Sequence, residues 1–427
     1  MKNWSVGAGK ALIRLPAGYP QLEGFTQVHD PICTRAVLIR DSRPSAVLIV
    51  SMEITSLTGD MVDELRTLAA ESALLSTDQV WVCAAHSFSS PHLFPEEALK
   101  TSEEKKLWLS YRQALMDSVR EAVRTAAGRD RDDTAEDLAG AELIVGRMDC
   151  PIAANRDIET EDGWWVGTGG DGPSDPTVTL LAFRDGQGSV RAALMHFPMQ
   201  SSVMDQSELS SGGKAVTGDV SGEACRRFEQ AHPGCVCLYL IGAAGDQAPV
   251  RKAVCDRWEQ GQKIRTDLQE EGFAIVKELG GQLAEAADRA LASGERCEGE
   301  IAMAGYTLLA PAKKMNRDLR SLRPSLNARY EAVDDLPTPI CLLRLGDIVL
   351  IGVRPELNCV TAREIAGGDR NLLVCTLVNG AAKYMADAHS YDRCTYEAMN
   401  SPWGRGAAEL LAQTCRSALK LIRVSGP

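Results

Sequence analysis

Short apolar runs of strand length alternate along this chain with segments of helical periodicity, and that alternation limits the folds open to it. The apolar runs lie at 36–39, 46–50, 80–84, 143–145, 178–183, 190–196, 236–241, 340–345, 348–353 and 372–378. Helical periodicity is found at 59–74, 96–127, 219–231, 265–293 and 406–422. This order of elements predicts an α/β fold in which helices flank mixed β-sheets.

The segments between these elements contain turn-forming residues but no interdomain linker. We expect loops at 167–176 and 207–213, both rich in glycine, serine, aspartate or proline. The segment Gly7-Ala8-Gly9-Lys10 lacks the spacing and the Ser/Thr of a phosphate-binding loop, so we expect a turn before a strand there. With no internal repeat in the sequence, we expect residues 1–427 to form one continuous domain.

Composition excludes several classes of partner. The net charge is −12, from 46 basic and 58 acidic residues, and the basic residues form no cluster, so neither nucleic acid nor an anionic membrane is an expected partner. No stretch approaches the roughly 18 to 20 apolar residues that cross a bilayer, and the N-terminus has no long apolar segment, which favours a cytoplasmic protein. The thirteen cysteines contain no C-x-x-C pair, and we expect buried, reduced thiols.

Two of the six histidines lie where α/β proteins often place their chemistry, at the carboxyl ends of predicted strands. His86 follows the run 80–84, and His196 ends the run 190–196 just before Phe197-Pro198. Each histidine alone is more often a hydrogen-bonded structural residue, but the pair suggests a metal site. Glu356, after the run 348–353, would supply a carboxylate, unless it is the first-turn acid of a helix that begins near Leu357.

Further short segments follow one another in a distinctive order along nearly the whole chain. They are Val6-Gly7-Ala8-Gly9-Lys10-Ala11, Gly24-Phe25, His29-Asp30-Pro31-Ile32, Ala84-Ala85-His86-Ser87-Phe88-Ser89-Ser90-Pro91, Asn155-Arg156, Asp175-Pro176-Thr177, Ala244-Gly245-Asp246-Gln247-Ala248-Pro249, Arg354-Pro355-Glu356, Asn379 through Tyr384, and Tyr396-Glu397. In this order they resemble the N-terminal catalytic domain of the neutral, non-lysosomal ceramidases.

The resemblance implies a single zinc ion held by two histidines, a glutamate and a tyrosine, which correspond to His86, His196, Glu356 and Tyr384. Zinc in such a site lowers the pKa of bound water toward ~7 and polarises a carbonyl group. The resemblance also places Arg156 and Tyr396 near the reacting carbonyl, where they would stabilise an oxyanion.

The sequence departs from that family at reactive positions. Ala248 replaces the serine of the family's Gly-Asp-x-Ser-Pro segment, and Phe88 replaces the second histidine of its His-x-His pair. Attack by metal-activated water survives both changes, whereas a serine acyl-enzyme does not. We also expect neither the C-terminal accessory domain nor the secretion signal that the resemblance would imply, and therefore a small, soluble substrate rather than ceramide.

The leading hypothesis is therefore a zinc-dependent hydrolase of an amide or related bond. Asp246 would be a proton-transfer or supporting group, or only a turn residue, and His92 or His389 could replace the lost proton carrier, although each is more typical of a loop. Trp164-Trp165 could line a pocket or simply pack. Two alternatives remain: a metal-dependent lyase, isomerase or glycoside-cleaving enzyme acting on a sugar derivative, and a non-catalytic metal-containing binding protein.

Overall fold

The computed structural model describes residues 4–18, 23–43, 45–94, 96–129, 138–161, 163–259, 262–314 and 330–424, so the first three residues of the N-terminal stretch considered above lie outside it. Its centre is a nine-stranded mixed sheet that runs in the order β12-β10-β9-β6-β1-β3-β4-β5, with β16 paired to β6. These strands are β1 (Trp4–Leu12), β3 (Cys33–Asp41), β4 (Ala46–Met52), β5 (Val80–Ala84), β6 (Ala139–Asp149), β9 (Thr177–Asp185), β10 (Val190–Phe197), β12 (Val236–Ile241) and β16 (Glu295–Cys297). The pairs β4–β5 and β10–β12 are parallel, whereas the other pairings in this sheet are antiparallel.

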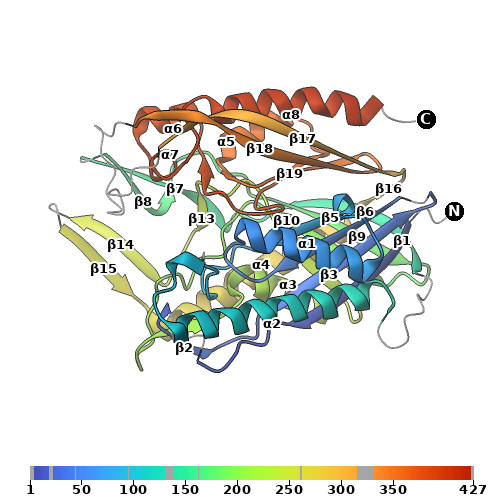
Figure 1. Ribbon diagram of the computed structural model, residues 1–427, viewed down its shortest axis with the longest axis horizontal. Helices are drawn as coiled ribbons and strands as arrows, with labels where there is room; N and C mark the ends of the chain where they lie inside the picture. The colour runs from blue at the N-terminus through green and yellow to red at the C-terminus, as the bar shows by residue number, and fades with distance from the viewer. Residues whose placement is uncertain are drawn as a thin grey trace.

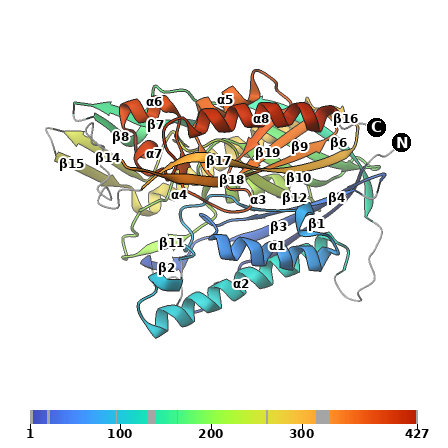
Figure 2. The same ribbon diagram turned by 45° about the horizontal axis from the view of Figure 1, so that its top comes forward.

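A second, four-stranded sheet lies over this one, and helices cover the outer face of each sheet (Figure 1). The second sheet contains β17 (Ile301–Lys313), β18 (Ala332–Leu345), β19 (Ile348–Val353) and β21 (Leu372–Cys375). Helices α1 (Gly59–Ala73), α2 (Ser102–Ala126), α3 (Asp219–Ala231) and α4 (Gly272–Ala292) pack on the large sheet, and α5 (Cys359–Ala366) and α8 (Ala407–Val424) pack on the small one. Figure 2 shows α1 and α2 below the sheets and α5 and α8 above them. The α/β fold with mixed sheets is as predicted.

The alternation of side chains along each strand explains this layering. Leu38 and Leu48 of the large sheet enter a core with α1 to α4, whereas Ile39 and Ile49 enter a second core with Leu343 and other residues of the small sheet. The opposite face of the small sheet packs on α5 and α8 in a third core. Because a strand points successive side chains to opposite faces, runs that are apolar throughout, such as Ala36 to Ile39, are those buried on both sides.

Smaller pairings complete the structure around one end of the sheets. They are β2 (Phe25–Val28) with β11 (Lys214–Val216), β7 (Ala153–Thr160) with β8 (Gly163–Gly170) and β13 (Gln247–Pro249), β14 (Val254–Glu259) with β15 (Gln262–Asp267), and β20 (Glu356–Leu357) with β22 (Tyr384–Met385). Two short helices, α6 (Ala388–Arg393) and α7 (Tyr396–Met399), follow β22. Strands such as β7 and β8 are rich in polar residues and glycine, so they lack the apolar runs that revealed the central strands.

The turn predicted at Gly7 to Lys10 is wrong, because these residues lie within β1. The two glycines allow helix α2 to pack closely on the strand, and they do not form a turn. A Cβ atom added to Gly7 would lie 1.9 Å from the carbonyl oxygen of Ala126, and one added to Gly9 would lie 2.1 Å from that of Ala122. Helix α2 therefore approaches β1 more closely than any side chain would allow.

The predicted starts of one loop and two helices also differ from those in the structure. The loop predicted at 167–176 begins later, since β8 continues to Gly170, where glycines again allow close approach to β7. The helix predicted from residue 96 starts at Ser102, where Thr101 accepts from the Glu104 backbone N–H at 3.1 Å and Glu104 accepts from the Thr101 N–H at 2.9 Å. The helix predicted from residue 265 starts at Gly272, after β15.

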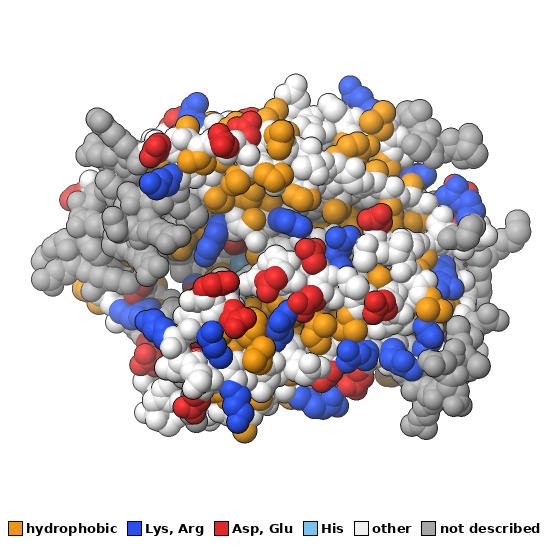
Figure 3. All heavy atoms as spheres, in the orientation of Figure 1, with side chains coloured by type: hydrophobic (Ala, Val, Ile, Leu, Met, Phe, Trp, Pro, Cys, Tyr) orange, Lys and Arg blue, Asp and Glu red, His pale blue; other side chains and the backbone are white. Residues whose placement is uncertain are grey.

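The described surface is mixed in character, and the thiols are free and mostly buried, as the sequence predicts. Charged side chains of both signs mix over α1 and α2, and apolar side chains gather over the small sheet and α8 (Figure 3). All thirteen cysteines are free, and most are buried. Among the described residues, no helix combines the length and apolar character needed to cross a bilayer. The organisation of residues 1–427 as one domain stays a prediction.

Candidate active site

The candidate site forms where segments far apart in the sequence meet above the carboxyl end of β5. His86 follows β5, and the parallel pair β20–β22 sets Glu356 directly opposite Tyr384. The Asn379 side chain accepts from the Val82 N–H at 2.9 Å and thereby ties the segment before Tyr384 to β5. Three of the predicted site residues, His86, Glu356 and Tyr384, are thus brought together, and all are buried.

The His86 ring is held by two oxygen atoms. Its Nδ1 lies 2.6 Å from the carbonyl oxygen of Thr55, and its Nε2 lies 3.0 Å from Oε2 of Glu356. Because a backbone carbonyl only accepts, Nδ1 carries a hydrogen, and the Nε2 lone pair then faces a carboxylate oxygen. Two electron-rich atoms so close need a cation, either a second proton on the ring or a metal ion. The backbone of His86 has φ +60°, a left-handed conformation that few residues other than glycine adopt and that marks a constrained position.

Burial would raise the pKa of Glu356, but His86, Arg156 and a hydrogen bond from Gln200 hold it below its usual value. Gln200 Nε2 donates to Glu356 Oε2 at 2.9 Å, and Gln200 Oε1 accepts from Arg156 Nη1 at 2.9 Å. Glu356 therefore remains a carboxylate in the interior. It lies in β20, and α5 begins only at Cys359, so the alternative that it is a first-turn acid of that helix is wrong.

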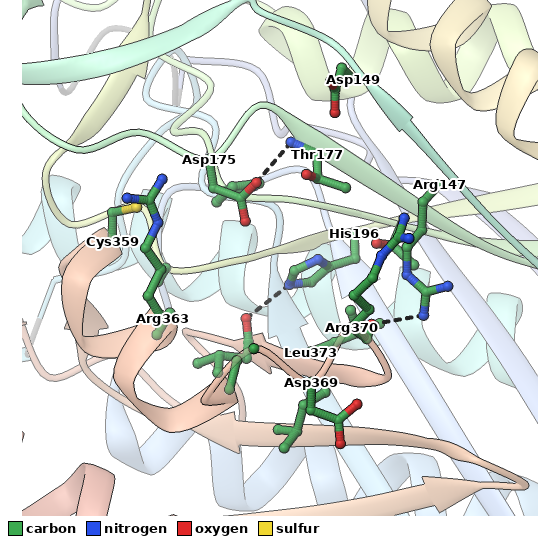
Figure 4. A pocket seen from close by; sticks show the side chains of 18 of the residues that line it. Arg147, Asp149, Asp175, Thr177, His196, Cys359, Arg363, Asp369, Arg370 and Leu373 are labelled. Atoms are coloured by element: carbon green, nitrogen blue, oxygen red, sulfur yellow. Dashed lines mark hydrogen bonds between the residues drawn. The ribbon is translucent and has the colours of Figure 1, made fainter.

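His196 is not part of this cluster, and its prediction as a fourth metal ligand is wrong. Its Nε2 lies 2.9 Å from the carbonyl oxygen of Val374, and its ring lines a cavity (Figure 4) that is not lined by His86, Glu356 or Tyr384. Within the described residues, no three His, Cys, Asp or Glu side chains are grouped so as to hold a metal ion. The chain turns at Pro198 after β10, and this turn brings Gln200, not His196, to Glu356.

Arg156, on β7, lies beside Tyr384 and Tyr396. Its guanidinium carbon is 5.3 Å from the centre of the Tyr384 ring and 5.5 Å from that of Tyr396, and the two rings meet edge to face at 5.7 Å. Burial raises the pKa of Tyr384 well above its usual value, although Arg156 opposes the change. Burial also raises the pKa of Tyr396. Both tyrosines are therefore neutral phenols near a fixed cation, as expected for groups that stabilise developing negative charge.

Glu397, which sequence analysis did not identify as a site residue, holds Arg156 in place. Its Oε1 accepts from Arg156 Nε at 2.9 Å and from Nη2 at 2.6 Å, and its side chain is fully buried. The neighbouring Asp157 is also buried, and burial together with the charge of Glu397 and a hydrogen bond to it raises the pKa of Asp157 to about 9. The raised pKa favours a protonated Asp157 at neutral pH, whose hydrogen Glu397 can accept, while Arg393 Nη2 lies 3.8 Å from its Oδ2. The only sequence signal was adjacency: each of these acids directly follows a predicted site residue, Arg156 or Tyr396.

Asp246 supports the backbone around the site. Its side chain accepts from the Cys359 N–H at 2.9 Å and from Asn155 Nδ2 at 3.0 Å, and its carbonyl oxygen accepts from the Arg156 N–H at 2.9 Å. Burial raises its pKa to about 7. The geometry fits a positioning role for Asp246, between β7, the turn before β13 and the start of α5.

The remaining candidates lie elsewhere or lack reactive groups. Phe88 packs edge-on against His86 at 4.6 Å, and Ala248 is buried in β13, where it pairs with Ala154. His92 is held by Glu23 at 2.7 Å. His389 is exposed on α6. Trp164 packs under Arg393, whose guanidinium carbon is 4.3 Å from the ring centre.

Comparison with known proteins rests on structure alone. No protein-family model and no curated protein matches the sequence. Among solved structures, a neutral ceramidase from Pseudomonas aeruginosa matches with a TM-score of 0.73 and 17% sequence identity, over 99% of this chain and 75% of that one. A ceramidase complexed with C2 matches with a TM-score of 0.74 and 17% identity, over 100% of this chain and 76% of that one. The protein therefore has the fold of the neutral ceramidases.

Proposed function

We propose that the protein is a hydrolase that cleaves an amide or related bond of a small substrate at the His86 cluster. The observation that carries this proposal is the meeting of His86, Glu356, Tyr384 and Arg156, which come from separate segments of a fold shared with ceramidases. A buried imidazole, a carboxylate and a fixed cation around one point are suited to activating water and stabilising an oxyanion.

The side chains of the cluster would have separate roles in oxyanion stabilisation and proton transfer. Arg156 and the Tyr396 hydroxyl would face the carbonyl oxygen that becomes negative, with Arg156 kept charged by its buried ion pair with Glu397. His86, oriented by the Thr55 carbonyl, would hold or release a proton at Nε2. Phe88 and Ala248 add no nucleophile or proton carrier, so attack by water fits the site better than a serine acyl-enzyme.

The cluster also fits a zinc ion, although with a smaller donor set than the sequence suggested. His86, Glu356 and Tyr384 would hold it, and the unshared electron pairs that face each other across 3.0 Å between His86 and Glu356 are the observation that favours a cation there. Gln200 presents its N–H to Glu356 and is no ligand in this orientation. Catalytic zinc sites commonly have fewer protein donors than structural ones, with water at the open position. Zinc bound there would act as a Lewis acid and lower the pKa of that water.

Metal analysis and product analysis test the two parts of this proposal separately. His86→Ala should lower the zinc content of protein purified and re-equilibrated with zinc, whereas His389→Ala, a change at an exposed histidine outside the cluster, should leave it unchanged. Equal zinc in the wild type and both variants would rule out this metal site. Incubation with a panel of small N-acyl compounds should give products with the added mass of water, and products without that gain would favour a lyase or isomerase instead.

A further inference from the structure

The cavity at His196 is separate from the proposed active site and has a chemistry of its own. It has a volume of about 630 Å³ and lies between the ends of β6, β9 and β10 on one side and α5 and β21 on the other. None of His86, Arg156, Glu356, Tyr384 or Tyr396 lines it. Figure 4 shows Arg363 on one side of His196 and Arg147 with Arg370 on the other. This volume is in the range of small-molecule sites.

Three arginines line the cavity, and two of them are oriented by neutral oxygen atoms rather than by carboxylates. Arg147 Nη2 donates to the Arg370 carbonyl at 2.8 Å and to Asn371 Oδ1 at 2.9 Å, and Arg363 Nη2 donates to the Ser174 carbonyl at 2.6 Å. In the part of the chain that the structure describes, none of the three arginines forms an ion pair. Arg147 Nε is buried without a hydrogen-bond partner there. The guanidinium groups of Arg147 and Arg370 are also close enough to repel each other, and burial and this repulsion lower the pKa of Arg147.

The acidic residues of the cavity are partly occupied by other contacts. Asp369 pairs with Arg423 on α8 and accepts from the Asn371 N–H at 2.9 Å. Asp175 accepts from the Thr177 N–H at 2.9 Å, and Asp149 is exposed at the rim. Asp369 offsets part of the charge of Arg147. Arg363 and Arg370 have no carboxylate at ion-pair distance among the described residues, so their positive charge remains available to a ligand, as is typical of sites that bind anions.

His196 gives the inner wall of the cavity a hydrogen-bond acceptor. Burial lowers its pKa, so the ring is neutral. Because its Nε2 faces the Val374 carbonyl at 2.9 Å, Nε2 carries the hydrogen and Nδ1 keeps a lone pair. Leu373, Ala243 and Pro198 add apolar surface beside it. A bound molecule would therefore meet guanidinium donors at the sides, an acceptor at the inner wall and an apolar surface.

We propose that this cavity binds a small organic anion, in which a carboxylate or phosphate group lies between Arg363 and Arg370, an apolar body covers Leu373, and a hydroxyl group donates to His196. The site is distinct from the His86 cluster and does not depend on the function proposed for that cluster. It also gives His196 a role in place of the metal binding that the sequence had suggested.

Calorimetric titration at low ionic strength with benzoate, phenyl phosphate, benzyl alcohol and benzylamine tests the charge preference. We expect at least one anion to bind, benzyl alcohol and benzylamine to bind at least about tenfold more weakly, and Arg363→Gln or Arg370→Gln to weaken anion binding about tenfold. Arg416→Gln, which removes an exposed arginine of α8 that pairs with Glu364 at 3.0 Å, is the matched control and should bind as the wild type does. Whether benzoate or phenyl phosphate binds more tightly identifies the head group.

Several results would overturn the proposal. They are the absence of binding by both anions, preferential binding of benzylamine, and equal affinities in the wild type and the two arginine variants. The role of His196 is tested with 4-hydroxybenzoate, which should bind more tightly than benzoate to the wild type but not to His196→Phe. Since binding is measured without turnover, and His86→Ala should bind the anion normally, failure here is distinguishable from failure of the proposed hydrolase.

Discussion

Replacing the buried acid Asp157 by asparagine should stabilise the protein, and the gain should grow with pH. Asp157 has a pKa of about 9 in the folded protein, against an ordinary value of 3.8, because of its burial and its contact with Glu397. The folded state therefore binds a proton that the unfolded state releases above pH 3.8. For an acid shifted upward, the folding free energy is unaffected below that pH and becomes less favourable as the pH rises toward 9.

The size of the effect follows from the shift. At pH 7 the cost of keeping Asp157 protonated is about 4 kcal/mol, and at pH 5 it is about 2 kcal/mol. The asparagine side chain of the variant is neutral in both states, and its amide N–H can take the place of the shared proton against Glu397. For a chain of 427 residues, a gain of about 4 kcal/mol corresponds to a rise in melting temperature of about 4 °C.

The assay is thermal and denaturant unfolding of the wild type and Asp157→Asn at several pH values between about 5 and 8. The difference in unfolding free energy should widen by about 4 kcal/mol across that interval. A difference that does not change with pH, or a variant less stable than the wild type at the upper end of the interval, would refute the shared proton. Asp63→Asn, at an exposed position on α1, is the control and should show no such trend.

Other predictions concern the same network and the packing around it. Glu397→Gln should lower stability by about 3–5 kcal/mol, because Arg156 loses the partner of a buried ion pair, whereas Glu364→Gln in the exposed pair with Arg416 should cost less than about 1 kcal/mol by the same denaturation assay. Gly9→Ala should destabilise the protein by about 1–3 kcal/mol, since its Cβ would meet the Ala122 carbonyl at 2.1 Å, while Gly59→Ala, with nothing within 4 Å, should be tolerated. Tyr396→Phe should leave unfolding unchanged but lower kcat about a hundredfold for the hydrolysed substrate, and unchanged kcat would remove its hydroxyl from the mechanism.

The sequence was sufficient to predict the central strands because burial on both faces leaves a continuous apolar run. The runs 236–241 and 348–353 coincide with β12 and β19 for this reason. The short strands around the end of the sheets lack such runs. In β7, Arg156 and Asp157 are polar yet buried, because both contact Glu397 rather than the apolar core. Hydropathy cannot separate such a strand from a loop.

The sequence likewise predicted the position of some site residues but not of others. His86 reaches the cluster because it follows a buried strand directly, and Glu356 and Tyr384 do so because a short parallel pair carries them from two such strands to one point. His196 also ends a buried strand, but its ring bonds the Val374 carbonyl and lines a separate cavity, and the turn at Pro198 brings Gln200 to the cluster instead. A strand end thus locates a residue along the sheet, while the face that its side chain occupies depends on register and on the following turn.

Arg156 and the Thr55 carbonyl fix the direction of every hydrogen bond in the cluster. Arg156 can only donate, so Gln200 must turn Oε1 toward it and its amide N–H toward Glu356. The Thr55 carbonyl can only accept, so His86 must carry a hydrogen on Nδ1 and turn its Nε2 lone pair toward the same carboxylate. As a result, Glu356 Oε2 and His86 Nε2 face each other with unshared electron pairs. Turning either Gln200 or the His86 ring to avoid this would break a buried hydrogen bond. A proton or a metal ion must therefore lie between these two atoms. The metal content of the wild type and of the His86 variant distinguishes the two cases, whereas turnover alone does not.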